Sequence, residues 1–133
     1  MKNKVTFIAK EQSEKLKTET KDAFVVIIDG AKINSWSEYW DCIATAFSFP
    51  ELPEYMEPDY HSYYDLMTDL SWIDNKSIVI IIENANEFLK NEYDLKNTIV
   101  NNFNEYLLPF WEKEVEITVV NGQTRNFCVY FVE

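Results

Sequence analysis

The residues best suited to chemistry in this chain are two carboxylates grouped with its only histidine. Asp65 and Asp69 are four residues apart, and His61 precedes Asp65 by the same spacing. If the segment is helical, all three share one face. Paired carboxylates can perform acid–base chemistry on a glycoside, or they can bind the basic groups of a partner protein.

An enzyme is the less favoured of these two alternatives. Two acids four residues apart are common on exposed helix faces, and no nucleophile, base and orienting group occur together. One histidine leaves a zinc site or a histidine-based triad without its usual partners. We therefore predict no catalytic residue, no bound metal and no cofactor.

The charge of the chain is strongly negative and unevenly distributed. Its formal net charge is −11, although residues 1–21 carry six lysines against three glutamates. Nine acidic residues and no lysine or arginine lie between Lys32 and Lys76. Such a body repels nucleic acid and anionic membranes and attracts basic partners. A solvated acidic surface that maintains solubility is the alternative interpretation.

Length and cysteine content indicate one domain in a reducing compartment. A chain of 133 residues can bury a sizeable core without a metal or a disulfide. Cys42 and Cys128 lie far apart without a CxxC pattern, so we expect reduced, packed thiols. The N-terminus lacks the features of a signal peptide, and no apolar run approaches the length of a membrane span. A cytoplasmic location is therefore expected.

Two uninterrupted apolar runs, Ala23–Asp29 and Ser77–Glu83, are typical of strands buried on both faces. Between them, Ser35 and Glu38 form a capping-box pattern at the start of a predicted helix, Ser35–Ser48. A loop rich in proline and glutamate follows. A second helix is predicted over about Asp59–Trp72, with Asp59 as its N-cap.

This second helix is predicted to have two different faces. At 100° per residue, a buried stripe is formed by Tyr63, Leu66, Met67 and Leu70. The opposite face displays His61, Asp65, Thr68 and Asp69, with Tyr64 on its flank. The predicted core side would then hold the acidic side firmly in place.

The remaining elements complete an α/β pattern. Helical spacing predicts a long third helix over Leu95–Phe110, disturbed at Pro109. The runs Glu116–Val120 and Asn126–Val132 predict a C-terminal hairpin or two independent strands. The fold class is therefore α/β, with a small, mostly parallel sheet of about three core strands covered by helices.

Residues 1–22 are predicted to form an N-terminal extension to a main domain spanning residues 23–133. The extension contains a short first element, Val5–Ala9, and a polar helix or linker, Lys10–Asp22. It could be an added edge strand, a dimer contact or a disordered arm.

Beyond this extension, the chain resembles the barstar family, whose members are intracellular inhibitors of secreted ribonucleases of the barnase type. The resemblance begins at Ile28-Asp29-Gly30, continues through the first helix to Phe49-Pro50-Glu51, and resumes in the stretch Tyr60–Leu70. The apolar strand and the long helix after it follow in the family's order. The resemblance covers about residues 28–110 and a final strand.

The resemblance implies roles for particular residues. Asp65 matches the helix aspartate that enters the nuclease's phosphate-binding pocket, and Tyr64 matches the aromatic position before it. His61 stands at a position that is acidic in barstar. The loop tyrosine of the family corresponds to Tyr55, within Leu-Pro-Glu-Tyr, or to Leu52 if the loop is aligned from the first helix. The family has a further acidic contact on the later helix, and Glu105 is the candidate for it in this chain.

The resemblance therefore predicts an inhibitor of a basic, secreted or transferred ribonuclease, acting in a 1:1 complex without nucleic acid or membrane. The alternative is an acidic immunity or interaction protein on the same scaffold that binds a different toxin or a regulatory protein. The predicted partner-binding residues belong to the second helix and the loop before it: Tyr55, Asp59, His61, Tyr64, Asp65, Thr68 and Asp69.

Overall fold

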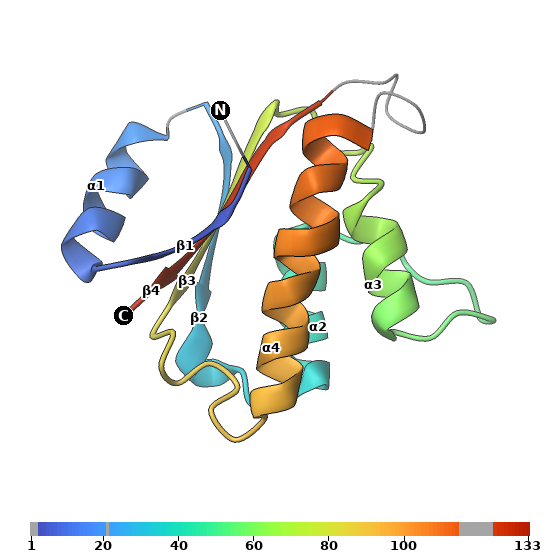
Figure 1. Ribbon diagram of the computed structural model, residues 1–133. Helices are drawn as coiled ribbons and strands as arrows, with labels where there is room; N and C mark the ends of the chain where they lie inside the picture. Colours follow the sequence, from blue (N-terminus) through green and yellow to red (C-terminus); the bar gives the residue numbers. More distant parts are fainter. Residues whose placement is uncertain (1–2, 21, 115–123) are drawn as a thin grey trace.

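The computed structural model describes residues 3–20, 22–114 and 124–133, and these residues build a sheet of four parallel strands (Figure 1). Its spatial order is β1-β4-β3-β2. The strands are β1 (Val5–Ile8), β2 (Phe24–Asp29), β3 (Ser77–Glu83) and β4 (Asn126–Val132). The α/β class with a parallel sheet is thus confirmed.

The sheet has four strands where about three core strands were predicted, because the N-terminal extension contributes β1 as an added edge strand, one of the alternatives left open for that segment. β1 pairs in parallel with β4, from Val5 opposite Val129 to Ile8 opposite Val132. β4 is therefore an interior strand, paired with β3 on its other side. The possible hairpin partner, Glu116–Val120, lies outside the described residues.

Helices cover both faces of the sheet, but unequally. One face carries only α1; the other carries α2, α3 and α4 (Figure 1). The helices are α1 (Lys10–Glu19), α2 (Trp36–Ala46), α3 (Tyr60–Met67) and α4 (Tyr93–Asn102), with a 3₁₀ turn, η1 (Gly30–Lys32), after β2. The larger core lies on the side of α2 to α4, and a small apolar cluster lies under α1.

β3 is the centre of the molecule, because five consecutive residues of the strand, 78–82, are buried. Ile78, Ile80 and Ile82 belong to the larger core, whereas Val79 and Ile81 face the layer of α1. Successive side chains of a strand point to opposite faces, so an uninterrupted β-branched run fills both layers. The prediction of a strand buried on both faces is confirmed for β3. It is wrong for β2, because β2 is an edge strand of the sheet and its Ile27 side chain is 51% exposed.

α2 begins as the capping pattern predicted, with one difference. The Ser35 hydroxyl accepts a hydrogen bond from the Glu38 backbone N–H at 3.2 Å. The Glu38 carboxylate, however, accepts from the backbone N–H of Asn34 at 2.8 Å, one residue before the cap. Both bonds satisfy backbone donors at the helix start, which otherwise have no partner within the helix.

α3 is shorter than the predicted Asp59–Trp72, since it ends at Met67. Thr68 follows as the C-cap, and Leu70 adopts a positive φ of 45° that no helix can continue. The predicted stripe is still largely buried, because Tyr63, Met67 and Leu70 are fully covered and Leu66 is half-buried.

The third predicted helix is longer than expected and does not end near Pro109. After α4 the chain continues as a π-helical turn, η2 (Phe103–Leu107), and then as a second one, η3 (Phe110–Glu114). A proline inside a helix removes a backbone donor and pushes away the preceding turn. The wider π turns on both sides accommodate Pro109 without breaking the helix.

Candidate protein-binding surface

The start of α3 is held by Asp59, as its predicted N-cap role requires. The Asp59 carboxylate accepts a hydrogen bond from the Ser62 backbone N–H at 2.9 Å. That bond lowers the pKa of the Asp59 carboxyl group, and the nearby His61 adds a smaller effect in the same direction. One oxygen of Asp59 is therefore committed to its own helix, although the residue remains exposed.

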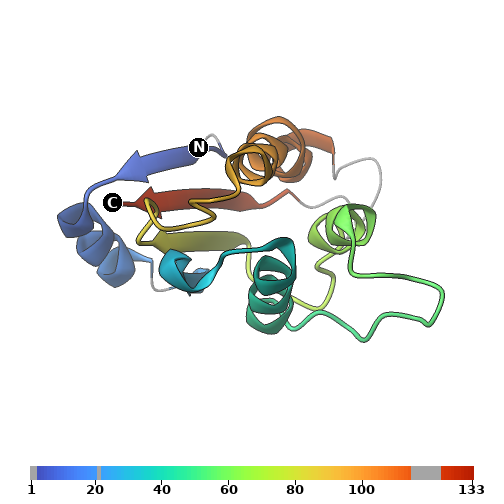
Figure 2. The ribbon, with the colours of Figure 1, turned by 90° about the horizontal axis from the view of Figure 1, so that it is seen from below.

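The loop before α3 is anchored where it enters the helix and exposed at its tip. The Trp36 indole N–H donates to the Pro58 carbonyl at 2.7 Å, and the Trp36 ring stacks on Tyr60 with centroids 5.7 Å apart. From there the loop projects beyond the body of the molecule (Figure 2). Tyr55 is 86% exposed, whereas Leu52 packs against the core. The sequence reasoning missed Trp36, which it treated only as a helix residue.

The outward face of α3 brings His61 and Asp65 together. His61 Nε2 lies 3.5 Å from Asp65 Oδ2, and the two side chains are 84% and 52% exposed. Among the described residues, no lysine or arginine forms an ion pair with Asp65. The carboxylate is thus directed outward and is accompanied only by an exposed imidazole.

The other predicted site residues on α3 are less exposed. Tyr64 is half-buried and packs against the larger core. Thr68 is half-buried, and its hydroxyl donates to the Tyr64 carbonyl at 2.8 Å, within the last turn of the helix. Asp69 is also half-buried. Burial lowers the pKa of the nearby Arg125 guanidinium, and the charges of Asp74 and then Asp69 oppose this effect in part. These residues flank Asp65 but are already engaged with the protein.

The C-terminal end of α3 is held by two residues that sequence reasoning did not single out. The buried Trp111 indole N–H donates to the Met67 carbonyl at 2.9 Å. Arg125 donates to the carbonyls of Leu70 and Ile73 at 3.0 and 2.7 Å, and its guanidinium lies 4.5 Å from the centroid of the Trp111 ring. Arg125 is the single arginine of the chain, and this is the one signal in the sequence that could have pointed to it.

The buried side of α3 is joined to α2 by two tyrosines. The hydroxyls of Tyr39 and Tyr63 are 2.7 Å apart, and neither side chain reaches solvent. Burial raises the pKa of both phenols, because the phenolate would lose its hydration. A satisfied polar pair of this kind orients one helix against the other.

These raised pKa values predict that the fold loses stability in alkaline solution. Each neutral phenol stabilises the fold fully below the unfolded-state pKa of about 10 and progressively less above it. Above that pH, the free energy of unfolding should fall by about 1.4 kcal/mol per pH unit for each tyrosine. In urea unfolding, the free energy of unfolding of a Tyr39→Phe/Tyr63→Phe variant should decline less steeply with rising pH than that of the wild type. The control Tyr106→Phe, at an exposed position, should show the same slope as the wild type. An unchanged slope in the double variant would contradict the assignment.

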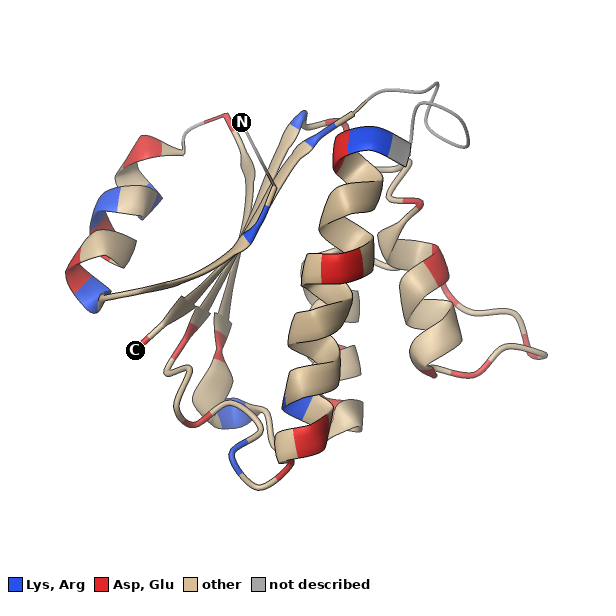
Figure 3. Cartoon of the chain, viewed as in Figure 1, with Lys and Arg blue, Asp and Glu red and all other residues tan. Residues whose placement is uncertain are grey.

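Acidic side chains dominate the surface around Asp65. The loop and α3 show acidic positions without basic ones (Figure 3), in keeping with the segment between Lys32 and Lys76 that has no lysine or arginine. Like charges in one region produce a field that attracts cations and basic protein surfaces. Among the described residues, no group of three or more potential ligands is arranged to hold a metal ion. No described helix is long and apolar enough to cross a membrane.

Comparison with known proteins identifies the family to which the chain belongs. A family model described as Barstar (barnase inhibitor) matches residues 23–122. The match includes β2, α2, α3, β3 and α4 and leaves β1, α1 and β4 outside. Neither the curated proteins nor the solved structures gave a significant match. Since the matched range covers most of the 133 residues, the chain belongs to the barstar family.

Proposed function

We propose that this protein inhibits a ribonuclease by placing Asp65 in the phosphate-binding part of the enzyme's active site, in a 1:1 complex. The observation that carries the proposal is the position of Asp65. Its side chain is 52% exposed on a helix that is held at both ends, and no lysine or arginine of the described chain neutralises it. The family match, to inhibitors of barnase, supports the choice of target class.

The chemistry of the target explains why a carboxylate suits this role. A ribonuclease must bind phosphate and stabilise its developing charge, so its active site carries arginine, lysine and histidine. A carboxylate accepts paired, charge-assisted hydrogen bonds from such groups where a phosphate would lie. The protein then blocks the site without offering a bond to cleave, and it needs no catalytic activity of its own.

The loop supplies the second part of the proposed contact. Tyr55 is 86% exposed, while Leu52 is half-buried against the core. This difference favours Tyr55 over Leu52 as the loop residue that meets the enzyme. A tyrosine offers apolar area with a polar tip at low entropic cost. Tyr64, on the flank of α3, extends the same surface, and Glu105, exposed on η2, is a candidate for the acidic contact from the later helix.

The surrounding acids should act mainly on the rate of association. Glu51, Glu54, Glu57 and Asp74 are exposed, so salt screens their charges effectively. Complementary surface charge raises the association rate constant more than it slows dissociation. We therefore expect stopped-flow association with a basic ribonuclease to slow steeply as NaCl increases, with dissociation changing far less. A rate that is independent of salt would show that this acidic surface does not face the enzyme.

The proposal is tested by titrating a barnase-type ribonuclease with the full chain. RNA cleavage should fall linearly with added protein and reach zero at one equivalent if binding is tight. Light scattering should then give the mass of one chain of each kind. Full activity at a large excess of the protein would refute inhibition of this enzyme class.

A second target class is favoured by one feature of α3. His61 stands where barstar has an acid, and its Nε2 lies 3.5 Å from Asp65 Oδ2, so an imidazole replaces a carboxylate beside Asp65 and the surface has one negative charge fewer. A toxin or regulatory protein with fewer cations in its cleft would suit this pair better. Capture of a defined basic protein that lacks ribonuclease activity, combined with no inhibition of barnase-type enzymes, would favour this alternative.

A further inference from the structure

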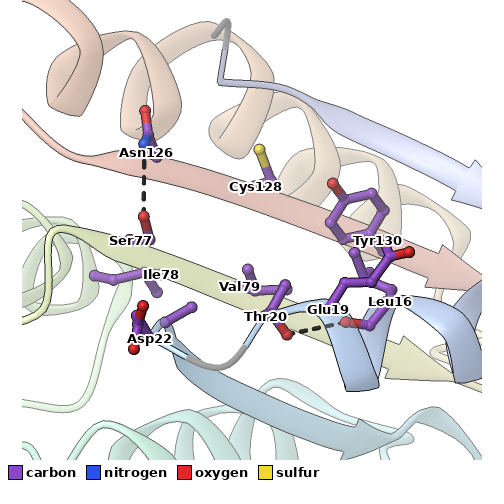
Figure 4. A pocket seen from close by; sticks show the side chains of 11 residues that line it. Leu16, Glu19, Thr20, Asp22, Ser77, Ile78, Val79, Asn126, Cys128 and Tyr130 are labelled. Atoms are coloured by element: carbon purple, nitrogen blue, oxygen red, sulfur yellow. Dashed lines mark hydrogen bonds between the residues drawn. The ribbon is translucent and has the colours of Figure 1, made fainter.

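A cavity of about 540 Å³ lies between α1 and the sheet, on the face opposite α2 and α4 (Figures 1 and 4). Its floor is formed by neighbouring side chains of β3 and β4, with Ser77 opposite Asn126 and Val79 opposite Cys128. Its wall comes from α1 and the residues that follow it, including Leu16 and Glu19. This volume is in the range of sites that bind small organic molecules.

The composition of α1 explains why the cavity exists. In Lys10–Glu19, Leu16 is the only large apolar residue, so the helix cannot fill the space above the sheet. Besides the packing of Leu16 on the small apolar cluster, the helix is held by an ion pair, with Lys17 Nζ 2.7 Å from a carboxylate oxygen of Glu83 at the end of β3. α1 also lies outside the range that matches the barstar family. The cavity thus lies between the extension and the strands β3 and β4, and none of its lining residues belongs to α3 or to the loop before it. It is therefore separate from the surface around Asp65.

The lining of the cavity is apolar at its floor and acidic at its rim. Cys128 is 6% exposed and Val79 7%, and Tyr130 projects from β4 beside them (Figure 4). Burial raises the pKa of the Tyr130 phenol, so this group is a neutral hydrogen-bonding partner at pH 7. Glu19 and Asp22 are exposed at the rim. None of the described lining residues is basic.

The rim carboxylates are weakly engaged within the protein. Glu19 forms an ion pair with Lys15 at 3.9 Å, between two largely exposed side chains, and such pairs contribute little. Asp22 uses its backbone carbonyl, not its side chain, to accept a hydrogen bond from Asn75. The hydroxyl of Ser77 and the amide of Asn126, 3.5 Å apart, lie at the same end of the cavity and offer further acceptors.

We propose that this cavity binds a small organic cation with an apolar body, such as an arylalkyl or alkyl amine. The apolar part would lie over Val79 and Cys128, with Leu16 above it. The ammonium group would meet Glu19 and Asp22 at the rim. Charge complementarity selects this class, because a carboxylate of the same shape would be repelled by both rim residues.

Matched probes test the proposal on the full chain. We would titrate ¹⁵N-labelled protein with 2-phenylethylamine, its neutral analogue 2-phenylethanol and its anionic analogue 3-phenylpropionate. The amine should shift the amide signals of β3, β4 and α1 and bind about fivefold more tightly than the alcohol, and the anion should bind weakest. Equal affinities for all three probes, shifts elsewhere on the protein, or no shifts would each overturn the proposal.

Two variants separate the apolar and the charged contributions. Val79→Phe should fill the cavity and abolish the shifts. Glu19→Gln/Asp22→Asn alters only exposed side chains, so folding should be retained, and affinity for the amine should fall about fivefold. The control Glu11→Gln/Asp41→Asn removes two exposed charges outside the cavity and should leave the affinity nearly unchanged. Equal losses in the two charge variants would show that net charge, and not the cavity, attracts the amine.

Discussion

Replacement of Asp65 by alanine is expected to weaken binding to the proposed ribonuclease target by about 2–5 kcal/mol. This range is that of buried charge pairs at protein interfaces, for which the barnase–barstar complex is the reference system. The loss is large because the enzyme's cations would be buried without a partner once the carboxylate is removed. Competition or calorimetric titration of purified variants would measure it.

Controls for this prediction come from acids of the same surface. Glu51→Ala and Glu57→Ala remove exposed charges from the loop, and Asp74→Ala removes one beyond α3. Each should change the affinity by less than about 1 kcal/mol. Asp65→Asn, which keeps the shape and removes the charge, should resemble Asp65→Ala. Equal small effects at all four acidic positions would refute the special role of Asp65.

His61 allows a second check on the same prediction. Asp65→Ala also removes the His61–Asp65 contact, but an exposed pair at this spacing stabilises a helix by no more than about 0.5 kcal/mol. Urea unfolding of Asp65→Ala should therefore resemble that of the wild type. A large loss of stability would mean that weaker binding reports damage to α3 and not the loss of a contact.

Replacement of Trp111 by alanine is expected to destabilise the fold by about 3–5 kcal/mol. The Trp111 side chain is fully buried, donates to the Met67 carbonyl at 2.9 Å and lies under the guanidinium of Arg125. Its removal leaves a cavity and frees the last turn of α3. Urea unfolding followed by far-UV circular dichroism would measure the change.

Variants at and near Trp111 divide this effect into its parts. Trp111→Phe keeps most of the apolar area but removes the hydrogen bond to Met67. It should therefore destabilise the fold less than Trp111→Ala, and the lost hydrogen bond should account for about 1 kcal/mol of that destabilisation. Tyr106→Ala, at an exposed position on η2, should cost no more than about 0.5 kcal/mol. If Trp111→Ala were as stable as Tyr106→Ala, Trp111 would not hold the C-terminal end of α3 as described.

Local pattern was sufficient for most elements of the fold. The apolar runs that became β2 and β3 were identified nearly to the residue, because β-branched residues in unbroken series have few alternatives to a buried strand. The caps at Ser35 and Asp59 were correct because a cap depends on residues no more than three positions away. The predicted C-terminal ends of α3 and of the helix through Pro109 were wrong, since contacts distant in sequence decide where these helices end.

The candidate site was predictable only in part for the same reason. Helical periodicity predicted that His61 and Asp65 share the outward face, and the structure places them 3.5 Å apart. Periodicity carries no information on Trp36, which holds the loop through Pro58, or on Arg125, which holds the segment after α3. These contacts join residues 22 and 52 positions apart in sequence.

The amino-acid sequence by itself determined the α/β class, the acidic character of the surface and the outward position of Asp65, because each follows from composition or from the period of a single element. Only the tertiary structure decided that β1 joins the sheet beside β4, where Val5 pairs with Val129, and that Trp111 and Arg125 close the end of α3. The cavity under α1 was likewise visible only in the tertiary structure. Such features depend on which surfaces meet when the chain packs, and the free energy of that packing is shared among residues far apart in the sequence.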